Sequence, residues 1–95
     1  MNIKELHQEG KVVSAISLFK GEDGIATAIQ LKEKSTLKEH ITKIPALLLC
    51  ICGKIEYHDE KGQKTELNAG DYVNIEPEVK HWLYALEASQ LVLLK

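Results

Sequence analysis

The chain has only two cysteines, and their spacing does not suit a disulfide. Cys50 and Cys52 lie two positions apart. In a strand, side chains at i and i+2 leave the same face roughly parallel and about 7 Å apart. A disulfide instead needs converging Cβ atoms. We therefore expect no intrachain bridge, which fits a protein of a reducing compartment.

The chain also lacks a long apolar run and an excess of charge of one sign. Its longest apolar stretch, residues 44–52, contains Pro45 and is too short to span a bilayer. Residues 1–8 are too polar for the hydrophobic region of a secretory signal. We therefore expect a cytoplasmic protein with no membrane partner. Twelve Lys+Arg against 14 Asp+Glu give a formal net charge of −2, which argues against a basic surface that binds nucleic acid.

Several signatures of catalysis and recognition are missing too. The sequence has no Gly-rich phosphate loop, no Gly-x-Ser-x-Gly turn and no Cys-x-x-Cys pair. No stretch interleaves basic with aromatic residues. These absences argue against phosphate-loop, serine-hydrolase and dithiol redox chemistry, and against binding of single-stranded nucleic acid.

What the chain does have is a regular series of short, strand-like segments separated by turn residues. A length of 95 residues with 44% hydrophobic content predicts one domain, 1–95, in which residues 1–10 are an N-terminal extension. The expected strands are residues 12–19, 25–31, 37–41, 46–52, 54–58, 64–67, 72–75, 81–86 and 90–94. Residues 3–9 are the one helical candidate. Eight or nine such strands predict an all-β antiparallel sandwich or barrel, and a jelly roll closes them most economically.

Two histidines form the one constellation that could support chemistry. Strand alternation places His40 and Thr42 on one face of their segment, and His81 and Leu83 on one face of another. If both faces point into the barrel, two imidazoles and a hydroxyl approach one another across strands. A histidine in that position can bind a metal, act as a general base or hydrogen-bond within the core.

The apolar segment 46–52 could supply a further wall, and as a continuous apolar run it is expected to be covered on both faces. If Ala46 faces inward, alternation carries Leu48, Cys50 and Cys52 to the same side. A thiolate beside two imidazoles would suit zinc or copper, but a buried cysteine usually behaves as a small apolar residue, and we favour core packing. The expected ligand pocket is His40, Thr42, Ala46, Leu48, Cys50, His81 and Leu83.

The aromatic residues are expected at contacts. Trp82 and Tyr84 take the face opposite to His81, so they should face another sheet or a partner subunit. Tyr57 could line a pocket mouth or an interface. His7 and His58 belong to no constellation and are interpreted as surface residues.

The spacing of these residues resembles the two motifs of the cupin superfamily, loosely over residues 12–94. Residues 36–53 are similar to the first motif, which is His-x-His, then Glu, then Gly. Residues 70–85 are similar to the second, which is Gly, five residues, Pro-x-Gly, two residues, His, three residues and Asn. The matching positions are Gly53, Gly70, Asp71 and His81. The resemblance is to small stand-alone, single-domain cupins of bacteria, and it implies a jelly-roll barrel.

The departures from the motifs concern the metal site. Metal-dependent cupins bind the ion through two histidines and a glutamate of the first motif and the histidine of the second. His40 and His81 match the first and last ligands, whereas Thr42 and Ala46 replace the other two and Ala85 replaces the Asn. Zinc, iron, manganese, nickel or copper could bind there only through a reduced set, since such centres generally take three or four protein ligands.

Three functional hypotheses follow. The first is a small-molecule-binding barrel in which His40 and His81 are polar anchors among apolar walls. The second is a metal-dependent oxygenase, isomerase or epimerase, with both histidines as ligands, a water on Thr42 and substrate oxygens completing the shell. Metal-free acid–base catalysis by the two histidines also stays open.

The third hypothesis is a non-catalytic regulatory or sensor module that acts as a homodimer. The dimer contact would bury some of Trp82, Tyr84 and the N-terminal strand. The sequence names neither ligand nor reaction.

Overall fold

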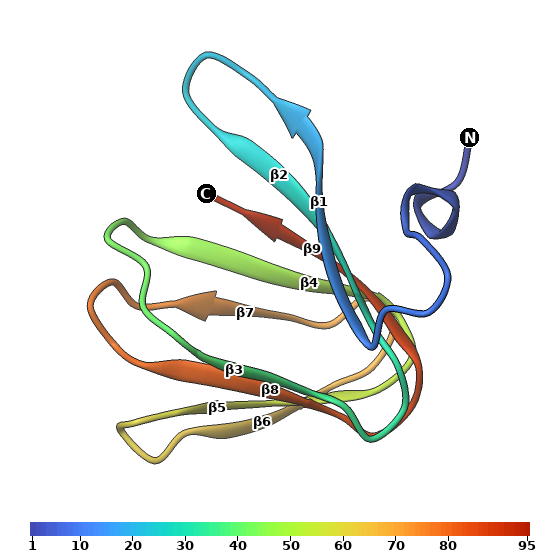
Figure 1. Cartoon of the computed structure of the whole chain (residues 1–95). Coiled ribbons are helices and arrows are strands. Elements are labelled where there is room, and N and C mark those ends of the chain that lie inside the picture. The colour runs from blue at the N-terminus through green and yellow to red at the C-terminus, as the bar shows by residue number, and fades with distance from the viewer.

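The computed structural model describes residues 1–95, which form nine strands preceded by one short 3₁₀ helix (Figure 1). The elements are η1 (Ile3–Leu6), β1 (Val13–Lys20), β2 (Ile25–Leu31), β3 (Thr36–His40), β4 (Ala46–Cys52), β5 (Ile55–Asp59), β6 (Lys64–Leu67), β7 (Tyr72–Ile75), β8 (His81–Ala85) and β9 (Ser89–Leu94). Each of the nine predicted segments is a strand whose ends differ by at most one residue. The all-β prediction is therefore confirmed.

The strands form two antiparallel sheets that face each other. One sheet has the order β1-β2-β9-β4-β7 and the other the order β3-β8-β5-β6. The chain repeatedly crosses between them, which is the double wrapping of a jelly roll. In Figure 1 the sheets converge on the right and spread apart on the left, where the β3–β4 and β7–β8 connections lie. The structure thus confirms an antiparallel barrel with one open end.

The core lies between the sheets and follows from strand alternation. In both β5 and β8 the first, third and fifth residues are buried and the second and fourth are half-buried. The buried apolar cluster contains Ile29, Leu31, Ala46, Leu48, Cys50, Ile55, Tyr57, Leu67, Val73, Ile75, Leu83, Ala85 and Leu91. Side chains from both sheets therefore fill the closed part of the barrel.

The expectation that β4 is covered on both faces was wrong. Ala46, Leu48 and Cys50 are buried, but the outward-facing Leu47 and Leu49 are only half-buried. The sequence pattern misled because the outward residues are also apolar, although no second layer packs over the whole of this face. The five-stranded sheet therefore presents apolar side chains on its outer side.

Six backbone positions have positive φ, and two of them matter for the barrel. Gly53, between β4 and β5, has φ +94, and a Cβ there would lie 2.3 Å from the carbonyl oxygen of Ala88. Only glycine fits this position. Glu78, in the β7–β8 connection, has φ 64, and its amide donates to the Thr42 carbonyl oxygen at 2.8 Å. This bond ties together the two connections at the open end of the barrel.

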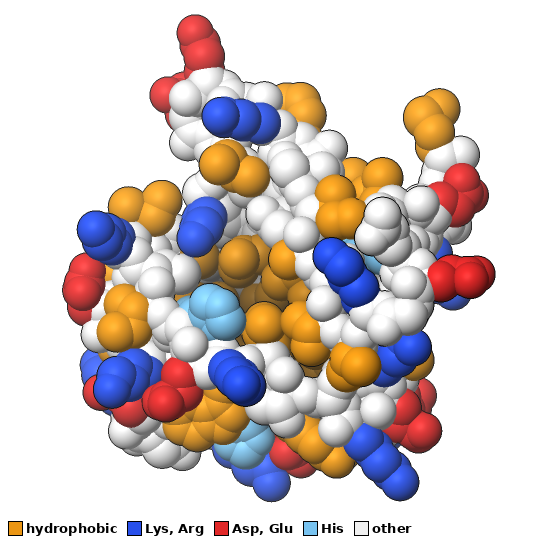
Figure 2. All heavy atoms as spheres, viewed as in Figure 1, with side chains coloured by type: hydrophobic (Ala, Val, Ile, Leu, Met, Phe, Trp, Pro, Cys, Tyr) orange, Lys and Arg blue, Asp and Glu red, His pale blue; other side chains and the backbone are white.

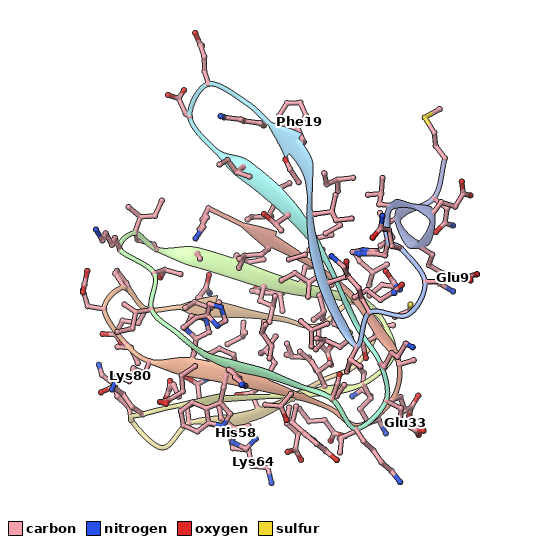
Figure 3. The ribbon with its side chains drawn as sticks, viewed as in Figure 1. Glu9, Phe19, Glu33, His58, Lys64 and Lys80 are labelled. Carbon is pink, nitrogen blue, oxygen red and sulfur yellow. The ribbon has the colours of Figure 1, made fainter.

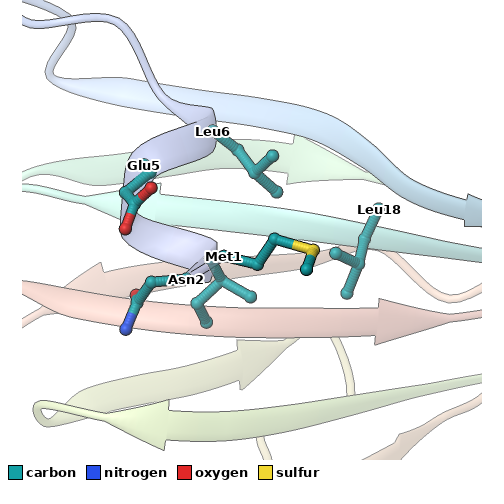
Figure 4. A pocket seen from close by; sticks show the side chains of 6 residues that line it. Met1, Asn2, Glu5, Leu6 and Leu18 are labelled. Carbon is teal, nitrogen blue, oxygen red and sulfur yellow. The ribbon is translucent and has the colours of Figure 1, made fainter.

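The N-terminal segment packs over the outer side of β1 and β2 in the five-stranded sheet. The helix η1 was expected over residues 3–9 but ends at Leu6. Met1 and Leu6 lie near Leu18 of β1 (Figure 4), where a depression of about 380 Å³ is present. His7 Nδ1 lies 2.7 Å from Ser14 Oγ, so His7 is half-buried against β1. No helix in the structure has the length and apolar character needed to cross a membrane.

Candidate functional site

His40 and His81 meet at the open end of the barrel. His40 is the last residue of β3 and pairs in register with His81, the first residue of β8. Their ring centroids are 6.3 Å apart. The two histidines that the sequence singled out are therefore neighbours on adjacent strands.

A β-bulge in β3 aims His40 inward. Leu37 pairs with Leu83, and His40 pairs with His81. The two pairs are three residues apart on β3 but only two residues apart on β8. The extra residue on β3 reverses its alternation, as a bulge does. Leu37 and His40 therefore share the inward face, whereas regular alternation places them on opposite faces. The expected grouping of His40 and Thr42 on one strand face fails as well, because β3 ends at His40.

His81 is a buried and largely neutral imidazole. It is 7% exposed, and Tyr57 stacks on it with ring centroids 5.9 Å apart. Burial lowers the pKa of His81, the contact with the Val79 carbonyl opposes this shift, and the charge of His40 adds to it. With Nδ1 directed at the Val79 oxygen at 3.4 Å, the neutral tautomer leaves Nε2 as an acceptor.

His40 sits at the rim, in contrast to the buried His81. It is exposed, and its Nδ1 contacts the carbonyl oxygen of Lys38. A depression of about 250 Å³ beside it is lined by Glu39, His40, Ile41 and Lys80. Figure 2 shows a hollow at this end of the molecule, with hydrophobic side chains in its depth and a histidine at its edge. A ligand entering the hollow would pass this rim.

The other expected pocket residues are buried. Ala46, Leu48, Cys50 and Leu83 belong to one core cluster. Thr42 lies in the β3–β4 connection, is 5% exposed, and its Oγ1 has no hydrogen-bond partner. The four apolar residues are therefore part of the packed core, and Thr42 leaves one unpaired hydroxyl in the β3–β4 connection.

The two cysteines are free and lie on different faces. A bulge between Cys50 and Cys52 pairs Cys52 with Gln90, whose side chain bonds Gln30 on the outer side of the five-stranded sheet. The expectation that Cys52 shares the inward face was therefore wrong. Burial, with the charges of Cys52 and Asp71, raises the pKa of Cys50 to about 11, so Cys50 remains a thiol.

Sequence reasoning missed the role of Tyr57. Expected at a pocket mouth or an interface, it is 1% exposed and stacks on His81. Burial, then the charges of Asp59 and Glu76, raise the pKa of Tyr57 and keep the phenol protonated. The alternation of Ile55, Tyr57 and Asp59 was the signal that could have placed it inside.

The donor set at this end fits a metal ion poorly. No three His, Cys, Asp or Glu residues of the chain are grouped so that they could hold one. His40 and His81 supply two nitrogens, the Thr42 hydroxyl is a weak neutral ligand, and Ala46 supplies nothing. Any bound ion would need other molecules to complete its shell.

The comparisons with known proteins rest on structure. No protein-family model matches the chain, and no curated protein matches it either. Among solved structures, a conserved protein with a double-stranded β-helix domain from Klebsiella pneumoniae is similar, with a TM-score of 0.84 and 18% identity over 99% of this chain and 85% of that one.

Two further structures give the same result. A cupin superfamily protein from Desulfitobacterium hafniense has a TM-score of 0.82 and 13% identity over 94% of this chain and 80% of its own. KdgF from a Halomonas species has a TM-score of 0.77 and 19% identity over 95% of this chain and 86% of its own. Likeness at these identities establishes the fold alone, and the chain therefore has the nine-stranded double-stranded β-helix fold that these structures share.

Proposed function

We propose that the protein binds a small molecule at the open end of the barrel, with His81 and His40 as polar anchors. The observation that carries this proposal is a buried, neutral imidazole with a free nitrogen, which lies beside the histidine that lines the depression at the rim. His81 is held by the Tyr57 ring on one side and lies beside His40 on the other. A few convergent polar groups on apolar walls are typical of ligand pockets.

The protonation state of the site restricts the ligand. Burial lowers the pKa of His81, so its Nε2 accepts a hydrogen bond at neutral pH. The Thr42 hydroxyl has no partner within the chain. We therefore propose a ligand that donates a hydrogen bond through a hydroxyl or amide and presents an apolar part to Leu48 and Leu83.

A fragment screen by methyl NMR tests this function. We expect hydroxyl- or amide-bearing compounds to shift the methyl signals of Leu48 and Leu83, and His81→Ala to weaken their binding about tenfold. His58→Ala, on the outer side of the same sheet, is the matched control and should bind normally. A screen in which no compound shifts these signals, or in which both variants bind alike, would contradict the proposal.

Metal analysis of the purified protein distinguishes small-molecule binding from metal-dependent catalysis. Elemental analysis is made on protein purified without chelators or metal-affinity resin. Stoichiometric zinc, iron, manganese, nickel or copper that is lost in His40→Ala and His81→Ala would favour the metal-dependent enzyme. Substoichiometric metal that is equal in all variants would favour the metal-free pocket.

We also propose that two copies pair through the outer side of the five-stranded sheet. Two neighbouring cross-strand rows are almost entirely apolar and carry no charge. The first row is Ile16, Ala28, Val92, Leu49 and Tyr72, and the second is Phe19, Ala26, Leu94, Leu47 and Asn74. Ala28 and Val92 are buried within the chain, so the exposed apolar surface comes mainly from Phe19, Tyr72 and Leu94. Across a two-fold axis each patch meets its own copy, so a neutral apolar patch pairs without repulsion between like charges.

This pairing surface differs from the one expected at Trp82 and Tyr84. Those two residues are half-buried and lie on the four-stranded sheet. Phe19 and Tyr72 are 66% and 59% exposed, and Phe19 lies on the part of β1 that projects beyond the barrel (Figure 3). The larger exposed apolar surface therefore supports pairing through the five-stranded sheet.

A further inference from the structure

A second concave surface lies on the outer side of the four-stranded sheet, away from the barrel interior. This groove has a volume of about 470 Å³ and is lined by Thr36, Lys38, Glu39 and Trp82. It is larger than the depression at His40. Trp82 faces away from His81 because neighbouring residues in β8 alternate sides. The groove therefore lies on the opposite side of β8 from His81, and it shares only Glu39 with the depression at His40.

The indole of Trp82 is fixed in its orientation by the neighbouring strand. The imidazole of His58, on β5, stacks on it with centroids 5.7 Å apart and planes 5° apart. His58 Nε2 lies 3.2 Å from Glu56 Oε1, and Lys64 Nζ lies 3.5 Å from the other oxygen of Glu56. His58 and Lys64 both point away from the barrel (Figure 3). This chain of contacts holds the indole in place.

The stack covers only one face of the indole. In the sheet order β3-β8-β5-β6, His58 approaches Trp82 from the β5 side. The groove residues Thr36 and Lys38 belong to β3, on the opposite side. The second face of the indole is therefore the one that lines the groove. A fixed aromatic face of this kind can receive a flat apolar surface at a small cost in side-chain entropy.

The rim of the groove offers hydrogen bonds of both kinds. Lys38 can donate, Glu39 can accept, and the Thr36 hydroxyl can do both. Neither the Lys38 ammonium nor the Glu39 carboxylate forms an ion pair or a side-chain hydrogen bond within the chain. A simple anion or cation would meet one favourable and one unfavourable charge here. A neutral ligand with a polar edge would satisfy both groups.

We infer that this groove binds a saccharide. A pyranose ring has an apolar C–H face, which stacks on the free face of Trp82, and a rim of hydroxyls, each of which donates and accepts. Lys38, Glu39 and Thr36 surround the aromatic face with the complementary groups. The site is a binding surface, and it adds a sugar-recognition function to a protein whose lumen takes a different ligand.

Tryptophan fluorescence tests this inference directly, because the chain contains one tryptophan. The probes are methyl β-glucoside, cellobiose and N-acetylglucosamine, which are neutral, with choline and inorganic phosphate as a cation and an anion. At least one saccharide is expected to change the emission saturably. Thr36→Val and Lys38→Ala should each weaken that binding up to about tenfold, whereas His81→Ala should leave it unchanged.

A second readout covers the case in which a variant is poorly folded. Amide NMR of the wild-type chain should show saccharide-dependent shifts at Thr36, Lys38 and the Trp82 indole N–H, and none at Leu48. Emission that no saccharide changes, a response to choline or phosphate instead, or a response lost in His81→Ala but kept in Thr36→Val would each overturn the inference. Failure of the lumen screen would leave this result unaffected.

Discussion

The phenol ring of Tyr57 stacks on the imidazole of His81 inside the barrel, with the two planes 21° apart. Burial is the main cause of both pKa shifts, and it lowers the pKa of His81 and raises that of Tyr57. Each ring is thereby held in its neutral form near pH 7. Neither ring of the pair therefore adds a charge to the apolar interior.

Acidification should destabilise the protein through His81. Its folded-state pKa lies below the ordinary 6.5, so the unfolded chain binds more protons as the pH falls. The stabilising contribution is fully present above about pH 6.5 and is lost as the pH falls toward the folded-state pKa. Chemical denaturation midpoints measured from about pH 7.5 to pH 5 should decrease less in His81→Gln than in the wild type. His40→Gln, at the exposed rim, should keep most of the decrease, because burial is the larger cause of the lowered pKa of His81. An equal slope in all three proteins would contradict the assignment.

Alkylation should distinguish the two cysteines. Cys50 is fully buried and its pKa is raised to about 11, whereas Cys52 is partly exposed. Because the thiolate is the reacting species, iodoacetamide at neutral pH should modify Cys52 first. Peptide mass spectrometry measures the order. Native Cys52→Ser protein should remain almost unmodified, and rapid labelling of Cys50 in it would show that the barrel opens.

Substitution of two glycines should separate close packing from backbone strain. Gly53 and Gly62 have φ +94 and +90, but a Cβ clashes only at Gly53. Gly62→Ala should cost about 1 kcal/mol, the strain of the left-handed region alone. Gly53→Ala should cost roughly 3 kcal/mol or more, because the Ala88 carbonyl must also move. Urea unfolding gives both values, and similar losses would argue against close packing at Gly53.

Charge placed on the outer side of the five-stranded sheet should prevent pairing. We expect a dimer for the wild-type chain in sedimentation velocity, and a monomer for Tyr72→Lys and Leu94→Lys. Lysine at both faces of a two-fold contact brings like charges together and leaves them desolvated. Ile41→Lys, at an exposed site in the β3–β4 connection, should still pair. The proposal fails if the wild type is monomeric or if all three variants remain dimers.

The strands could be predicted because each is a short run with a clear turn on either side. Residues 25–31 show this well, since the predicted strand has the observed bounds and Ile29 and Leu31, two positions apart, are both buried. The bulges could not be predicted, because nothing in residues 37–40 or 50–52 marks the extra residue. They decide the directions of His40 and Cys52, so the site was harder to predict than the fold.

Glu78 shows a different limit of sequence reasoning. It stands where the second cupin motif has its glycine, so the sequence departs from the motif there. The backbone nevertheless adopts φ 64, a conformation that glycine accommodates best. The turn therefore has a backbone conformation typical of glycine although the residue is glutamate. The match between the sequence and the cupin motif is for this reason weaker than the match between the folds.

The bulge in β3 absorbs one extra residue between Leu37 and His40, so the pairing of His40 with His81 tolerates a change in chain length. Removing one residue at positions 38–39 would leave Leu37 and His40 two positions apart, where regular alternation keeps both on the inward face, opposite Leu83 and His81. A single-codon deletion should thus remove the bulge without separating the anchor pair. Replacing either histidine, rather than shortening the strand, is therefore what would dismantle the site.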